Sequence, residues 1–88
     1  MAKANKRNYG GAIADYTAAI REPHLSTDIK AMVLYNRALA YSAMHEDAKS
    51  AADLAAVLEM PRLSQNIKTQ AQQRQERMRR RSVNTDSR

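Results

Sequence analysis

The 88-residue chain has no cysteine, tryptophan or phenylalanine, and only two glycines and two prolines. The lack of cysteine excludes a disulfide framework, a cysteine zinc site and a thiol nucleophile. No apolar run approaches the ~20 residues of a membrane span, and the chain starts with MAKANKR, which lacks the apolar core of a signal peptide. We therefore expect a cytoplasmic protein that does not enter a membrane. So few turn formers, in a chain rich in Ala, Gln, Arg, Leu and Met, favour one small all-α domain.

The formal net charge of +6 comes from the C-terminal part of the chain. Residues 1–61 hold seven basic and seven acidic residues, whereas residues 62–88 hold eight basic and two acidic residues. A neutral body is therefore followed by a basic arm. We expect any function that depends on charge to involve this arm.

An internal repeat organises the chain. Pro23 opens the phrase PHLSTDIKA, and Pro61 opens the similar phrase PRLSQNIKT. A shift of 38 residues gives eight identities among the 19 pairs that begin at Ala12 and end at Lys30. A repeat of this length is typical of helical arrays, in which each unit buries its apolar face against the next.

Apolar residues recur at helical spacing within each unit. The pattern predicts four antiparallel helices, approximately over residues 9–22, 27–44, 47–60 and 64–81. The second should start at one of the N-cap residues Ser26 to Asp28 and bury five side chains: Ile29, Val33, Leu34, Ala38 and Tyr41. The domain then spans residues 1–81, and the polar sequence SVNTDSR predicts a disordered tail over 82–88.

These residues resemble the tetratricopeptide repeat (TPR) family, whose unit is a helix A–turn–helix B pair. Residues 34–61 are similar to one whole repeat, with Tyr41 at the helix A tyrosine and Ala38 at the small residue of the A–B contact. Residues 8–23 are similar to helix B of the preceding repeat. The resemblance implies one and a half to two repeats, stacked as a superhelix of about four helices.

The chain departs from the family pattern in several places. His45 stands at the turn glycine, Arg37 at the helix A leucine and Ser50 at the helix B alanine. The period of 38 residues exceeds the usual length of about 34. The first repeat also has almost no helix A, so apolar side chains of the first helix should be less covered than in a full array. Such a strip favours weak pairing of two copies or a longer parent protein.

No constellation of residues points to an enzyme or to a cofactor. His24 and His45 lie in turns without a second ligand at suitable spacing, so we interpret them as solvated histidines rather than as metal ligands. Asp15 and Asp53 occupy equivalent positions of the repeat, which indicates a structural role rather than a pair of catalytic acids. The sequence therefore favours a binding protein.

The TPR resemblance implies a non-catalytic protein–protein interaction module that holds a partner peptide or protein against its helix A faces, and the basic charge of the fourth helix favours an acidic partner. The residues expected to bind are Met32, Tyr35, Asn36 and Leu39 of the second helix, and Gln70, Gln73, Arg74 and Arg77 of the fourth. Asn36 resembles the asparagine of TPR domains that clamp the C-terminal carboxylate of chaperone peptides, and Arg74 falls where that clamp has an arginine. Gln70 stands where the clamp has a lysine. The alternative for Asn36 is an amide at the surface or between helices.

The basic arm leaves three alternatives open. RQERMRRR fits the solvated face of a terminal cap helix, a surface for acidic partners, or a contact to nucleic acid. Clustered arginines suit phosphate groups, but no aromatic residue for base stacking follows Tyr41. Nucleic-acid binding through the arm would therefore be weak, non-specific and sensitive to salt.

Overall fold

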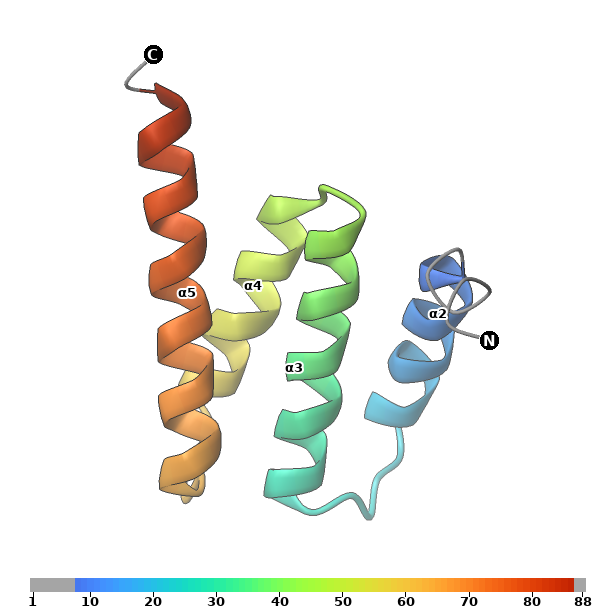
Figure 1. Cartoon of the computed structure of the whole chain (residues 1–88). Helices are drawn as coiled ribbons and strands as arrows, with labels where there is room; N and C mark the ends of the chain where they lie inside the picture. The colour runs from blue at the N-terminus through green and yellow to red at the C-terminus, as the bar shows by residue number, and fades with distance from the viewer. Residues whose placement is uncertain (1–7, 87–88) are drawn as a thin grey trace.

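The computed structural model describes residues 8–86, with side chains described as far as residue 80. This part of the chain forms four helices and no strand: α2 (Tyr9–Ile20), α3 (Thr27–Ala43), α4 (Asp47–Leu58) and α5 (Gln65–Asp86). Consecutive helices run antiparallel (Figure 1). The all-α prediction is therefore confirmed.

Three helix ends differ from the prediction by two residues or more. α2 and α4 each end two residues early, at Ile20 and Leu58, because residues that precede Pro23 and Pro61 avoid the helical conformation. α5 continues to Asp86, five residues past its predicted end at 81. No glycine or proline follows Pro61, and the residues of the predicted tail cost a helix less than about 0.7 kcal/mol each. That tail is helical over 82–86, and residues 87–88 lie outside the described part.

The sequence repeat is also a structural repeat. The Ile29 N–H donates to Oγ of Ser26 at 3.2 Å, and the Ile67 N–H donates to Oγ of Ser64 at 3.4 Å. Both serines thus cap the start of a helix, and they stand 38 residues apart. By the same shift α2 corresponds to α4, and α3 corresponds to α5.

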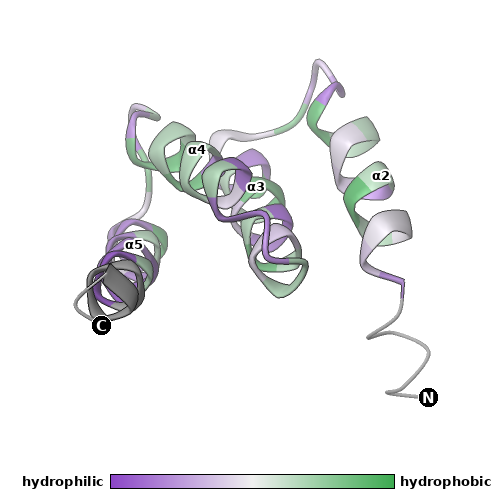
Figure 2. Ribbon diagram, turned by 90° about the horizontal axis from the view of Figure 1, so that it is seen from above, coloured by the Kyte–Doolittle hydropathy of each residue, from purple (hydrophilic) through white to green (hydrophobic). Residues whose placement is uncertain are grey.

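The core lies between α3, α4 and α5. Its buried apolar side chains are Ala31, Leu34, Ala38, Leu54, Val57, Ile67 and Ala71. α2 contributes no buried residue and contacts only α3 among the other helices. Seen from above, α2 stands beyond α3 on the side away from α4 and α5 (Figure 2). α2 therefore contributes half-buried side chains but no fully buried one, unlike α3, α4 and α5.

The prediction that Ile29 is buried is wrong. Its side chain is 53% exposed, whereas its repeat equivalent Ile67 is 8% exposed. The segments before the two helices differ as well. Met60 packs against the core that includes Ile67, but the equivalent position before Ile29 holds Glu22. A charged residue there cannot supply apolar cover.

One arginine joins three helices. Arg37 of α3 donates from Nε to Oδ2 of Asp53 at 2.8 Å and from Nη2 to Oδ1 at 2.7 Å. Its Nη1 donates to Oγ1 of Thr17 on α2 at 3.0 Å. The hydrogen bond to Asp53 raises the pKa of Arg37, although burial acts in the opposite direction. Asp53 is 5% exposed, so this bidentate pair fixes α4 against α3 in one register.

Ser50 and His45, the other two residues that depart from the TPR pattern, also fit the structure. Oγ of Ser50 donates to the carbonyl oxygen of Ala38 at 2.7 Å, so this fully buried hydroxyl is satisfied. His45 has a φ of 64°. It follows α3 in a Schellman turn, in which the Glu46 N–H donates to the Tyr41 carbonyl at 2.9 Å and the His45 N–H donates to the Ser42 carbonyl at 3.0 Å.

We predict that Arg37 and Asp53 are strongly coupled. Arg37→Leu or Asp53→Leu alone should lower the free energy of unfolding by about 3 kcal/mol, because each leaves a largely buried charge without its partner. The double variant should lose much less than the sum of the two single losses. Urea unfolding of the four proteins measures the coupling, and additive losses would show that the pair does not act as a unit.

We also predict that His45→Gly stabilises the fold by about 1 kcal/mol. Glycine adopts a positive φ without the steric cost that an L side chain carries. His24→Gly is the control, because it changes the same residue type in a loop that the structure leaves at negative φ. Thermal unfolding should show a higher midpoint for His45→Gly only, and a lower midpoint would contradict the turn geometry.

Candidate functional site

Five of the eight residues predicted to bind a partner line one small hollow. This α3/α5 hollow has a volume of about 80 Å³ and is formed by Tyr35 of α3 and by Gln70, Gln73, Arg74 and Arg77 of α5. The four α5 residues recur at intervals of three or four, so they share one face of the helix. The hollow therefore gathers two guanidinium groups, two amides and one phenol.

The arginines of the α3/α5 hollow have no acidic partner in the described part of the chain. Nε of Arg74 is buried and has no hydrogen-bond partner there. Buried donors in folded proteins are nearly always paired. An anion placed in the hollow, such as a carboxylate, would lie between the side chains of Arg74 and Arg77, which both line it.

The next two arginines of α5 are engaged differently. Arg79 and Arg80 each form an ion pair with Glu76, and the Arg80 Nε lies 3.3 Å from Oε2. The hydrogen bond from Arg79 lowers the pKa of Glu76, and the same bond raises the pKa of Arg79. All three side chains are exposed enough that the pairs add little to stability. The basic arm is thus divided between paired and unpaired arginines.

Asn36 and Leu39 lie in a separate groove. This α2/α3 groove has a volume of about 530 Å³ and is lined by Asn8, Tyr9, Ala12, Asp15, Tyr16, Asn36, Leu39, Ala40 and Ala43. Tyr35 and Asn36 point to different neighbours because successive residues of a helix are turned by about 100°. Met32 is 41% exposed and lines neither space. The structure therefore divides the predicted binding face between two surfaces.

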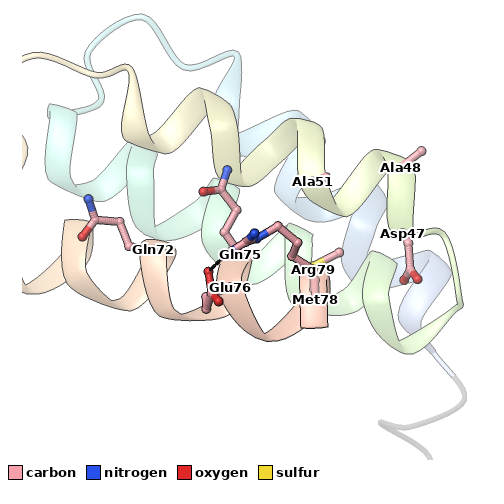
Figure 3. A pocket seen from close by; sticks show the side chains of 8 residues that line it. All are labelled: Asp47, Ala48, Ala51, Gln72, Gln75, Glu76, Met78 and Arg79. Atoms are coloured by element: carbon pink, nitrogen blue, oxygen red, sulfur yellow. Dashed lines mark hydrogen bonds and ion pairs between the residues drawn. The ribbon is translucent and has the colours of Figure 1, made fainter. Parts of the chain in front are cut away.

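A third groove, between α4 and α5, was not predicted as a site. It also has a volume of about 530 Å³, and its lining is Asp47, Ala48, Ala51, Gln72, Gln75, Glu76, Met78 and Arg79. Figure 3 shows this α4/α5 groove with the ion pair between Glu76 and Arg79. α5 presents Gln72 and Glu76 at the positions where α3 presents the core residues Leu34 and Ala38. This polar face fits the end of a helical array.

Sequence reasoning predicted an uncovered apolar strip on the first helix but placed none of its residues in the partner-binding site. Tyr9, Asp15 and Tyr16 line the α2/α3 groove. The available signal was the match of Asp15 to Asp53 across the repeat, which we interpreted as structural. That interpretation fits Asp53, which binds Arg37. Asp15, in contrast, is exposed and forms no ion pair within the described residues.

Metal-binding groups and membrane-spanning helices also bear on the kind of site. Over residues 8–86, no three His, Cys, Asp or Glu side chains are grouped in a way that could hold a metal ion. None of the described helices combines the length and the apolar character needed to cross a membrane. The chemistry that the described surfaces offer is hydrogen bonding, charge and apolar contact.

Comparison of the chain with family models, with curated proteins and with solved structures gives no match.

We predict that Arg74 is not required for stability. Arg74→Met keeps the apolar stem and removes the buried donor that lacks a partner, so the free energy of unfolding should stay within about 1 kcal/mol of the original value. Arg37→Leu, the corresponding change at the paired arginine, should be clearly destabilising. If Arg74→Met were as destabilising as Arg37→Leu in urea unfolding, Arg74 would have a structural partner instead.

Proposed function

We propose that the chain is a non-catalytic protein–protein interaction module, a TPR-like stack of helices, that binds an acidic peptide in the α3/α5 hollow. The observation that carries the proposal is the pair Arg74 and Arg77. Both line the hollow, and neither has an acidic partner in the described chain. Arg74 is half-buried without an ion pair, whereas arginines are mostly exposed or paired.

The arrangement of the helices supports a TPR-like unit. In the TPR interpretation α3 and α5 are the helix A elements, and they contact each other directly. α2 and α4 are the helix B elements, and each packs against the helix that follows it. The Arg37–Asp53 pair and the Ser50 hydrogen bond replace apolar contacts that the family makes at the same positions.

The side chains around the hollow suit a peptide carboxylate. The guanidinium of Arg74 offers the geometry for a bidentate contact, and Arg77 adds a second positive charge. Gln70 and Gln73 carry amides that donate to a further carboxylate or to a peptide carbonyl. Met32 is exposed one turn before Tyr35 on α3, so an apolar side chain of the peptide has a contact next to the charged end.

Nucleic-acid binding by the basic arm is the competing function. Two of the arginines that it would use, Arg79 and Arg80, are already paired with Glu76. Tyr35 is the aromatic residue of the hollow, and α5 has none for stacking on bases. The peptide hypothesis uses the amides and the phenol of the hollow as well as its charge, and we therefore prefer it.

We predict that a short acidic peptide with a free C-terminal carboxylate shifts the amide signals of Tyr35, Gln73 and Arg74 in an NMR titration. Amidation of the peptide's C-terminus should weaken binding, because it removes one charge. Arg74→Met should weaken binding about tenfold, consistent with the loss of a charge-assisted contact. Lys68→Met is the matched control, because it removes one positive charge from the same helix at an exposed position outside the hollow.

The competing function gives a different result in the same experiment. A single-stranded oligonucleotide should then bind more tightly than the peptide, with a steep dependence on salt. Lys68→Met and Arg74→Met should weaken that binding about equally, because phosphate contacts depend on total charge. Such equal effects would contradict peptide binding in the hollow.

A further inference from the structure

The α2/α3 groove has an occupied counterpart elsewhere in the molecule. The shift of 38 residues pairs Ala12, Asp15 and Tyr16 of α2 with Ser50, Asp53 and Leu54 of α4. It also pairs Asn36 and Ala40 of α3 with Arg74 and Met78 of α5. The α2/α3 surface and the surface formed by these residues of α4 and α5 are therefore the same structural element in successive units of the repeat. The latter surface differs from the α4/α5 groove, which other residues line.

α3 covers this surface in the second unit. Ser50 donates its hydroxyl to the carbonyl oxygen of Ala38 at 2.7 Å, and its Oγ lies 3.5 Å from the sulfur of Met78. Asp53 accepts two hydrogen bonds from Arg37. Ser50 and Leu54 have no exposed surface at all. In the second unit this surface thus binds a helix in which an arginine stands directly before an alanine.

The equivalent surface of the first unit is open in the described part of the chain. Ala12 and Tyr16 are half-buried, and Asp15 is exposed. The groove between these residues and Leu39 has a volume of about 530 Å³. Six of its nine lining residues are alanine, leucine or tyrosine, and the carboxylate of Asp15 is its acidic group. The α2/α3 groove therefore has side chains that suit the binding of a helix, and no described helix covers it.

We propose that the α2/α3 groove binds an amphipathic α-helix of a partner protein, whose arginine pairs with Asp15. The partner helix would carry the pattern of α3, in which an arginine stands directly before a small residue. The small residue lets the two backbones approach, as Ala38 does over Ser50. This site lies on a different surface from the acidic-peptide hollow and has the opposite charge preference, so it does not depend on that function.

A second copy of the chain is a poorer occupant. Its α3 is already buried in its own core. Its α5 is the other helix of this type, but it holds Gln75 and Glu76 where α3 holds Arg37 and Ala38. Docking α5 would therefore bring a carboxylate into the groove beside Asp15, and like charges at a buried contact are unfavourable. The charge of Asp15 selects instead a helix with an arginine at the position that Gln75 occupies in α5.

A synthetic peptide of residues 25–46 of this chain, with blocked ends, is a suitable probe because it contains the α3 pattern. It would be titrated into the isotope-labelled full chain. Amide shifts should appear at Ala12, Asp15, Tyr16 and Leu39. The peptide should gain helical circular dichroism on binding, because short helices are marginal in water alone.

Charge reversal tests the pairing with Asp15. Asp15→Arg in the protein should weaken binding by about tenfold or more, as expected when one partner of a desolvated charge pair is replaced. The peptide variant Arg37→Asp should recover affinity for Asp15→Arg while binding the original protein poorly. Glu22→Arg is the matched control, because it reverses an exposed acid near the end of α2 that does not line the groove.

Three results would overturn the proposal. The first is a lack of shifts on α2 at high peptide concentration. The second is shifts centred on Ser50, Asp53 and Leu54, which would mean that the peptide displaces the chain's own α3. The third is a mass in light scattering that doubles with concentration and is reduced by Asp15→Arg, because a second copy would then be the occupant.

Discussion

The two hydrogen bonds between Arg37 and Asp53 hold the fold in its register. A small protein without phenylalanine or tryptophan has few large side chains for its core, and four of the eight buried apolar residues in its described part are alanines. Packing of such small residues alone leaves neighbouring helices free to slide. The bidentate pair fixes the position of α4 along α3, and the third guanidinium nitrogen reaches Thr17, so α2 depends on the same side chain.

Much of the fold could be predicted from the sequence, because the repeat carries local signals. Ser26 and Ser64 are N-cap residues that predict two helix starts, and the two prolines predict that a helix ends before each of them. The exposure of Ile29 could not be predicted from the helical period, because the period does not say how far neighbouring segments cover each position. The Arg37–Asp53 pair was also missed, because it joins residues 16 positions apart whose contact depends on the packing of two helices.

The candidate site was predicted in part. Four residues of α5 and Tyr35 come together as expected from a shared helix face. Asn36 and Leu39 were assigned to the same surface, but they turn toward α2. A linear pattern identifies the exposed side of a helix well. It does not say which of two neighbouring helices each half of that side will face, and this division separates the two surfaces that we propose as binding sites.

The central claim is that α2 and α4 are the same element of the repeat, and that α3 covers α4 whereas no helix of residues 8–86 covers α2 in the corresponding way. Native-state hydrogen exchange tests it most directly, since it gives a free energy of opening for each amide. The account predicts that amides of α2 around Tyr16 exchange through local opening, at a much lower free energy than those of α4 around Leu54. Equal protection of the two helices, both at the free energy of global unfolding, would contradict it.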